Sequence, residues 1–522
     1  MRGLSGDGEE LAEGMDQTQH NKLVEVSVAE LQRRFEDRVL SSVEAVEGYL
    51  KRIEDLDQSG PTLRSVIEVN PDAVAIARSL DEERAEKGPR GPLHGVPVLL
   101  KQCIGTADKM STNCGCLALE GYVAPEDAFV VRKLRDAGAV ILGKTNMSEW
   151  GFFRSDQGCS GWSTLGGQTK NPYVLDRSPC GSSSGSGTAV SASLCTVAIG
   201  AETDGSVTRP AGMTGIVGLK PTIGLVSRTG VMPISPTQDT LGPMGRCVRD
   251  VAVLLNALTG VDEDDPVTEK SKDYVGVDYT QFLVDEASPT NNMLKGTRFG
   301  FDVDTVSNRQ GATAAMIGAI RNLESLGAEV IEIHADGYGL FNDNEMVVVL
   351  TEFKDSLDTS LEKTGRLRGI PDLIAYNLEH ADRVMPFFGQ DILEKTASFP
   401  SKGDESYQAA RKASVAGAQA KIDNLLETHK LDAIVALTNS SPPYVIDPLV
   451  GDNLGSVGGC STTPAMAGYP HVSFPGPLHK GLPWGISMYA SAFSEGKLLR
   501  FAHAFEVHGK FRRLPTYKPT LE

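Results

Sequence analysis

The sequence is poor in cysteine. Eight cysteines occur in 522 residues, and no two of them have C-x-x-C spacing. Cys114 and Cys116 are separated by one glycine, which is too close for a usual zinc knuckle, and no histidine cluster lies beside them. The nine histidines contain no H-E-x-x-H pattern. We therefore expect reduced, small hydrophobic cysteines in a cytoplasmic protein, and no metal site.

Long apolar runs and an excess of positive charge are lacking as well. No stretch reaches 18 apolar residues, so no membrane-spanning helix is expected. Acidic residues outnumber basic ones by 68 to 50, a formal net charge of −18, which argues against a nucleic-acid partner or a polybasic membrane binder. Residues 1–22 have no apolar signal-peptide core and carry an excess of acids, which predicts a disordered acidic tail before a domain over 23–522.

The rest of the chain alternates between helical and strand patterns. Two helices are expected within 27–54, the first with Ser27 as its N-cap, and a buried strand is expected over 95–100. A helix, a glycine and a short apolar strand follow one another at 129–142, at 313–333 and, without the glycine, at 408–437. This alternation predicts an α/β protein with a covered, largely parallel or mixed sheet.

Two further segments have a distinct composition. The acidic run 262–265 and the residues that follow it, to about 295, predict a surface excursion. Residues 336–405 are rich in helical pattern and poor in strand signals, which predicts a helical subdomain or lid over a cleft.

Two motifs match well-known patterns without the local structure that those patterns need. Residues 138–145 match the phosphate loop G-x-x-x-x-G-K-T, but a helix precedes them and their apolar middle predicts a buried strand, so ATP binding is disfavoured. Residues 181–185 match the nucleophile elbow G-x-S-x-G, but the preceding segment has two prolines and reads as a loop. An α/β-hydrolase site is disfavoured for the same reason.

Glycine is what the sequence has in excess: 55 residues, of which 14 lie between 158 and 230. Serine and glycine often mark linkers, but the segment 177–222 also contains an apolar, helix-length run at 188–200, for which we expect a helix. Consecutive small residues let backbone approach a substrate closely, and the segment 202–206 predicts a tight turn that presents several N–H groups. Such a turn suits the stabilisation of an oxyanion.

These residues resemble the amidase signature family. The stretch Cys180–Ser186 is followed by Asp204-Gly205-Ser206-Val207, by Pro210 and by Gly218-Leu219-Lys220-Pro221-Thr222. Upstream lie GVPVLLK (95–101) and GKTNMSEW (143–150), and downstream QDTLGPM (238–244) and the tail from Gly485 to Leu499. The resemblance covers about 25–510, and the wording is most similar to the fungal and bacterial branch that includes peptide amidase. It implies a central, mixed, twisted sheet with helices on both faces, and a signature core over 158–250.

The resemblance also implies the site residues. Ser206 would be the nucleophile, Ser182 would bridge it to Lys101, and the peptide bond between Gly181 and Ser182 would be cis. The remaining residues carried over bind substrate or form the oxyanion hole: Thr203, Asp204, Gly205, Ser206, Gly181, Ser183 and Met147. No cofactor or metal is implied, and a homodimer stays open.

The chemistry of this set is coherent on its own terms. A serine hydroxyl needs a base, and with no histidine in the set that base must be a lysine. A lysine accepts a proton only when it is neutral, and burial at the end of an apolar strand favours the neutral form of Lys101. Where the family has an acid after this lysine the chain has Gln102, and Asp204 and Thr208 also depart from the usual residues.

The sequence thus predicts a serine-dependent amidase that cleaves a small-molecule or peptide carboxamide through an acyl-enzyme. Two alternatives stay open: a component like the amidase-type subunit of a glutamine-dependent tRNA amidotransferase, and an esterase or carbamate hydrolase on the same scaffold. A binding protein without activity is disfavoured because Lys101, Ser182 and Ser206 are all present.

Overall fold

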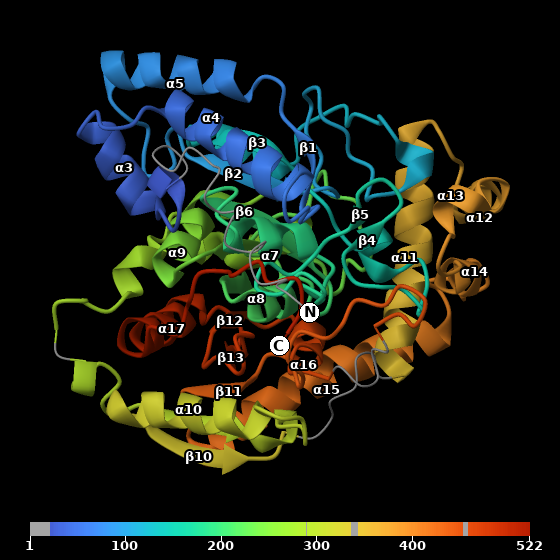
Figure 1. Cartoon of the computed structure of the whole chain (residues 1–522). Helices are drawn as coiled ribbons and strands as arrows, with labels where there is room; N and C mark the ends of the chain where they lie inside the picture. Colours follow the sequence, from blue (N-terminus) through green and yellow to red (C-terminus); the bar gives the residue numbers. More distant parts are fainter. Residues whose placement is uncertain (1–20, 289, 336–342, 453–457, 522) are drawn as a thin grey trace, which may run out of the picture.

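A mixed, eleven-stranded sheet runs through the part of the chain described by the computed structural model, which covers residues 21–288, 290–335, 343–452 and 458–521 (Figure 1). In sheet order the strands are β1 (Val66–Val69), β3 (Val140–Thr145), β2 (Pro97–Lys101), β6 (Val197–Glu202), β8 (Thr240–Gly245), β7 (Val217–Lys220), β12 (His471–Pro475), β13 (Gly485–Tyr489), β11 (Ala433–Leu437), β9 (Arg298–Asp302) and β10 (Glu329–Ile333). Two short strands, β4 (Trp162–Ser163) and β5 (Gly167–Gln168), pair separately.

The sheet is parallel at two places and antiparallel between them. β3, β2 and β6 run parallel to one another, and so do β11, β9 and β10. β8, β7, β12 and β13 alternate in direction across the middle. Lys101 at the end of β2 and Glu202 at the end of β6 therefore lie at the same edge of the sheet, where Thr240 pairs with Glu202. Carboxyl ends of parallel strands are the usual place for a ligand site in an open α/β sheet.

Helices cover both faces of the sheet. One face carries α7 (Ser184–Ser191), α8 (Thr208–Thr214), α15 (Glu405–His429) and α16 (Thr462–Ala467), and the other carries α6 (Phe129–Asp136), α9 (Val248–Leu258), α10 (Ala312–Ser325) and α17 (Glu495–Gly509). At the first end of the sheet lie α3 (Val28–Glu36), α4 (Ser42–Arg52) and α5 (Ala73–Lys87). The α/β architecture expected from the alternation of patterns is confirmed.

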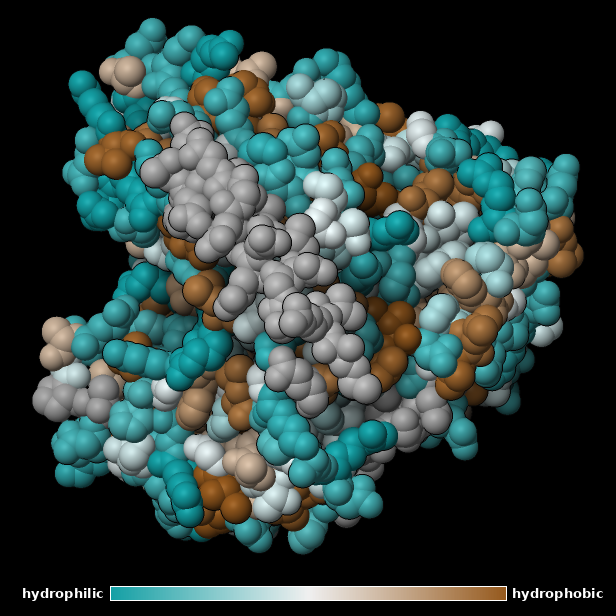
Figure 2. Space-filling view, in the orientation of Figure 1, coloured by the Kyte–Doolittle hydropathy of each residue, from teal (hydrophilic) through white to brown (hydrophobic). Residues whose placement is uncertain are grey.

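Beyond the sheet, four more helices lie at the right of Figure 1, where α11 packs against α15 and the other three group around α11. They are α11 (Asp343–Thr364), α12 (Ile370–Glu379), α13 (Ala381–Val384) and α14 (Asp391–Ala397). The helix-rich segment expected over 336–405 is thus helical from residue 343 on, while 336–342 lie outside the described residues. No helix in the described ranges is long and apolar enough to cross a membrane. Hydrophilic residues cover most of the surface over α3 and α5 in Figure 2.

Several local expectations can be compared with the structure. Ser27 caps α3 by accepting a hydrogen bond from the N–H of Glu30 at 3.2 Å. The expected strands and helices at 95–100, 129–142, 313–333 and 408–437 are all present. Of the expected N-terminal tail, Asn21 and Lys22 belong to a short turn (Asn21–Leu23), and residues 1–20 lie outside the described residues.

One expectation was wrong, and a second needs correction at two residues. The apolar run 188–200 is not one helix: α7 ends at Ser191, and Val197 begins β6. Its β-branched end fits a buried strand better than a helix. The acidic run 262–265 is not simply a surface excursion either, because Asp262 and Asp265 are buried. Asp265 forms a salt bridge of 2.6 Å with Arg228, and Asp262 accepts a hydrogen bond from Ser227, so both carboxylates have partners inside the fold.

Candidate active site

Lys101 is the last residue of β2, between β3 and β6, and only 2% of its surface is exposed. Its Nζ atom lies 2.7 Å from Ser182 Oγ and donates to the carbonyl oxygen of Ala201 at 2.9 Å. Burial lowers the pKa of this lysine, and no carboxylate forms a salt bridge with it among the described residues. The surroundings thus favour the neutral amine.

Two serines continue the chain of hydrogen bonds from Lys101. Ser182 lies just before α7, and its hydroxyl donates to Ser206 Oγ at 2.9 Å. The peptide bond between Gly181 and Ser182 is cis, as the resemblance implied. Lys101, Ser182 and Ser206 come from three separate parts of the sequence, and the fold joins their side chains by two consecutive hydrogen bonds.

Ser206 stands in the turn between β6 and α8. Gly205 has a positive φ of 78°, a conformation that glycine adopts at no steric cost. The side chain of Glu202 fastens the turn: its Oε2 accepts from the N–H groups of Val207 at 2.7 Å and Thr208 at 2.9 Å. Burial raises the pKa of Glu202. Within the described part of the chain, the N–H groups of residues 203–206 donate no hydrogen bond, so they are available to an oxyanion.

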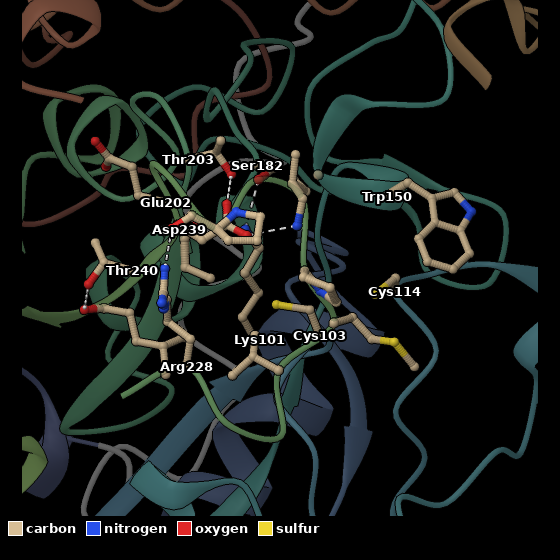
Figure 3. Close-up of a pocket in the computed structure, with 18 of the residues that line it drawn as sticks. Lys101, Cys103, Cys114, Trp150, Ser182, Glu202, Thr203, Arg228, Asp239 and Thr240 are labelled. Atoms are coloured by element: carbon tan, nitrogen blue, oxygen red, sulfur yellow. Dashed lines mark hydrogen bonds between the residues drawn. The ribbon is translucent and has the colours of Figure 1, made fainter. Parts of the chain in front are cut away.

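Two cavities meet at these residues. The larger, of about 210 Å³, is lined by Lys101 and by mostly apolar side chains, among them Met147, Trp150, Met232, Ile234, Leu241 and Phe353. The smaller, of about 40 Å³, is lined by Ser206, Asp204, Arg209, Gly181, Cys180, Ser160, Phe152 and Phe153. Gly151, Ser182 and Thr203 line both. Figure 3 shows Lys101, Ser182 and Thr203 converging at the larger cavity.

Not all of the expected substrate-binding residues reach a cavity. Met147, Thr203, Asp204 and Gly181 do. The side chain of Ser183 is fully buried and donates to the carbonyl oxygen of Ala201 at 3.2 Å, and neither it nor Gly205 is among the residues lining the two cavities.

The side chains at the positions that depart from the family form hydrogen bonds with residues other than Lys101, Ser182 and Ser206. Asp204 Oδ2 accepts from the Thr462 hydroxyl at 2.7 Å, and burial raises the pKa of the Asp204 carboxyl. Gln102 donates to Ser111, and Thr208 Oγ1 lies 3.2 Å from Glu202 Oε2.

Asp239 is a site residue that the sequence reasoning did not single out. Its carboxylate accepts from Thr203 Oγ1 at 2.6 Å and from the N–H groups of Ile234 and Ser235, each at 2.8 Å, and burial raises its pKa to about 6. It thereby ties the loop 229–239, which lines the larger cavity, to the turn that carries Ser206. Asp239 belongs to the QDTLGPM motif (238–244), which supported the family resemblance but did not indicate a role for any single residue in it.

The fold also bears on the phosphate-loop match at 138–145 and the nucleophile-elbow match at 181–185, because neither segment has the local structure that its motif needs. Residues 140–145 form the fully buried strand β3, which leaves no loop around a phosphate. Ser183, the middle of the G-x-S-x-G match, follows a loop rather than a strand and has no histidine partner among the described residues. In the same residues, no group of three or more histidines, cysteines or acids could hold a metal ion.

Comparison with known proteins agrees with this geometry. The family model described as Amidase matches residues 44–499. A probable amidase of Arabidopsis thaliana is 39% identical over 94% of this chain and 92% of its own length. The crystal structure of native peptide amidase from Stenotrophomonas maltophilia has a TM-score of 0.87 and 42% identity, covering 94% of this chain and 98% of that chain.

A glutamyl-tRNA(Gln) amidotransferase subunit from Thermoanaerobacter pseudethanolicus is more distant, at 30% identity over 95% of this chain and 98% of its own length. A family match that covers most of the chain, together with amidase relatives along nearly all of it, settles the class of the protein. The chain belongs to the amidase signature family and is an amide-hydrolysing enzyme.

Proposed function

We propose that the enzyme hydrolyses a carboxamide through an acyl-enzyme on Ser206, with Ser182 as proton relay and Lys101 as base. The observation that carries the proposal is the line of reactive atoms, 2.7 Å from Lys101 Nζ to Ser182 Oγ and 2.9 Å from there to Ser206 Oγ. Both distances are short enough for proton transfer in either direction.

In the first half of the reaction, Ser206 Oγ attacks the carbonyl carbon and passes its proton to Ser182, whose own proton goes to neutral Lys101. The carbonyl oxygen gains negative charge and accepts hydrogen bonds from the N–H groups of residues 203–206. When the tetrahedral intermediate collapses, the C–N bond breaks and the proton returns from Lys101 through Ser182 to the leaving amine. In the second half, water attacks the ester by the same relay, giving the carboxylic acid and restoring Ser206.

The setting of Arg228 supports an amidase over a component of a glutamine-dependent amidotransferase. Glutamine carries a carboxylate, which calls for a cation in the pocket. Arg228 lies at the larger cavity, but its Nε and Nη2 atoms bind Asp265 at 2.9 and 2.6 Å and its Nη1 donates to the carbonyl of Pro236. A glutamine carboxylate that bound Arg228 would have to displace Asp265. Arg209 lines the smaller cavity, and it too is engaged, since it donates to Asn439 Oδ1 at 3.0 Å and to the carbonyl oxygen of Gly458 at 3.4 Å. An ester or carbamate would meet the same reactive groups, so these substrates belong in the assays.

Two further proposals concern the wall of the substrate cleft and the cellular location of the enzyme. Within the segment expected as a substrate-cleft subdomain (336–405), we propose that α11 forms one wall of the cleft, because Phe353 lines the larger cavity. We also propose a reducing, cytoplasmic location, which the eight free cysteines support.

The test is a comparison of the purified wild type with Lys101→Ala, Ser182→Ala and Ser206→Ala. Ammonia or amine release from a panel of amides should fall by roughly 10²–10⁴-fold or more in each variant. Mass spectrometry of the stopped wild-type reaction should find the acyl group on the peptide that contains Ser206. Full activity in Ser206→Ala would rule the mechanism out.

A further inference from the structure

The two cavities adjoin one another at shared lining residues. Ser206 lines only the smaller cavity, Lys101 lines only the larger, and Gly151, Ser182 and Thr203 are common to both. A substrate carbonyl bonded to Ser206 can thus extend one of its substituents past Ser182 into the larger cavity. Whatever narrows that passage decides which substituents enter.

Ile234 lies beside Gly151, one of the residues that line both cavities. It lines the larger cavity, and a β-carbon placed on Gly151 would come within 2.4 Å of Ile234 Cδ1 and 3.8 Å of Ser182 Oγ. Gly151 has a φ of +67°, so both its conformation and the closeness of Ile234 favour glycine there. The end of the Ile234 side chain therefore rests against the backbone of Gly151, a residue that lines both cavities together with Ser182.

The position of Ile234 is fixed from two sides. Its N–H donates to Asp239 at 2.8 Å, and Asp239 also holds Thr203 in the turn before the nucleophile. The residues that follow are held by Glu352 of α11, which accepts from the Ser235 hydroxyl at 2.5 Å and from the Thr237 N–H at 2.9 Å. A side chain held in a fixed position relative to the reacting atoms can limit the size of the substrate group that fits beside it.

The larger cavity suits an apolar group of moderate size. Its volume of about 210 Å³ corresponds to roughly seven water molecules in the liquid, which is room for a benzyl or branched alkyl group. Met147, Trp150 and Phe353 supply apolar walls. Since Arg228 is already paired with Asp265, an anionic group gains little at the mouth.

The need to keep Lys101 dry decides which half of the substrate enters. The amine leaves after acylation, whereas the acyl group stays bonded to Ser206 until water attacks. An acyl group in the larger cavity keeps water away from Lys101 during that interval, so that the lysine stays neutral for the second half of the reaction. A leaving amine in the same place would open the cavity beside Lys101.

We propose that Ile234 is a specificity-determining residue, which admits uncharged, apolar acyl groups of moderate size to the larger cavity, while the amine half of the substrate is directed away from that cavity. The proposal rests on the acyl-enzyme at Ser206 described above, and it names the substrate class of that site: amides of arylalkyl or branched aliphatic acids.

The experiment compares primary amides that share ammonia as leaving group and differ in the acyl part: butanamide, 3-phenylpropanamide and 4-phenylbutanamide. Ile234→Phe should lower the ratio of kcat/KM for 3-phenylpropanamide to that for butanamide by roughly tenfold or more. Ile234→Ala shortens the side chain beside Gly151, so it should raise the ratio of kcat/KM for 4-phenylbutanamide to that for butanamide. The matched control is Ile317→Phe on α10, whose isoleucine is 39% exposed; its ratios should equal those of the wild type.

A second series keeps the acyl part constant and enlarges the amine, from butanamide to N-methyl- and N-benzylbutanamide. If the Ile234 variants discriminate by amine size, or if their acyl ratios stay within about twofold of the wild type while the amides still turn over, the proposal is wrong. These outcomes are distinct from failure of the acyl-enzyme mechanism, which would appear as persisting activity in Ser206→Ala.

Discussion

The role of base that we propose for Lys101 requires that its amine be both desolvated and hydrogen-bonded to a hydroxyl. Its nitrogen donates to a backbone carbonyl and lies 2.7 Å from Ser182 Oγ, so the lone pair of the neutral amine can face the serine. Burial supplies the rest, because it lowers the lysine pKa. Each property alone is common in proteins, and the combination is what the proposed base requires.

This leads to a prediction on pH and substitution. In the wild type, kcat/KM should fall as the pH drops through the lowered pKa of Lys101, because the protonated amine cannot accept the proton of Ser182. Lys101→Arg stays protonated throughout, so its activity should be lower by roughly 10²–10⁴-fold at every pH. The check is kcat/KM against pH with one amide for both proteins. An arginine variant with the activity and the acid limb of the wild type would contradict the role of Lys101.

Single residues differ in how far the sequence reveals them. The motifs containing Lys101, Ser182 and Ser206 resemble a known family, and this resemblance was enough to predict all three before any geometry. Ile234 and Phe353 were out of reach, because a neutral side chain becomes part of a pocket only through what the fold places opposite it. For Ile234 that partner is Gly151, far away in the sequence.

At the scale of elements, periodicity identified helices and strands where the pattern was long or sharply bounded. The helix, glycine and strand at 129–142 are an example, since Gly138 ends the helix and apolar residues follow immediately. The run 188–200 misled because its small residues suit either state. Only burial between β2 and β8 makes 197–202 a strand.

The loop 229–239 and α11 form a second functional unit at this scale. Glu352 is almost fully buried and binds Ser235, Thr237 and the hydroxyl of Tyr407 on α15, so one carboxylate joins the cavity wall to two helices. Glu352→Ala should lower the free energy of unfolding by about 1–3 kcal/mol, because it leaves buried donors without an acceptor. It should also raise KM more than it lowers kcat, since the wall loosens while the triad stays intact.

Thermal unfolding and steady-state kinetics on the same preparation measure both effects of Glu352→Ala. Glu352→Gln, which keeps one acceptor oxygen, should recover part of each. The exposed Glu332→Ala on β10 serves as the matched control and should change neither quantity. A large loss of kcat with KM unchanged would instead assign Glu352 to the chemical step.

At the scale of the whole molecule, the sequence indicated an α/β class but not the order of the strands. The site depends on that order: β2 and β6 must be neighbours for Lys101 to reach Ala201 and Ser182. Two strands that are remote in sequence pair through side-chain packing and hydrogen bonds that no local pattern encodes. The family resemblance supplied what local patterns could not.

The whole fold also shifts the pKa of several acids, among them Glu506 on α17, which is partly buried. Its carboxylate accepts from the N–H of Val248 at the start of α9, yet burial and the nearby Asp250 raise its pKa to about 8, against an ordinary value of 4.5. A folded state that holds this proton more tightly than the unfolded chain gains stability at low pH. That gain is lost as the pH rises from about 4.5 through about 8.

Glu506→Gln should remove this dependence, because glutamine keeps an acceptor oxygen for Val248 and never ionises. Near pH 4.5 the variant should be as stable as the wild type. Near pH 8.5 its melting temperature should be higher, and its free energy of unfolding should exceed that of the wild type by an amount on the order of a few kcal/mol. Melting temperatures of the two proteins at both pH values measure the effect, with the exposed Glu332→Gln as the control that should follow the wild type. If Glu506→Gln lost stability equally at both pH values, the carboxylate would be serving the fold in its ionised form, and the raised pKa would be refuted.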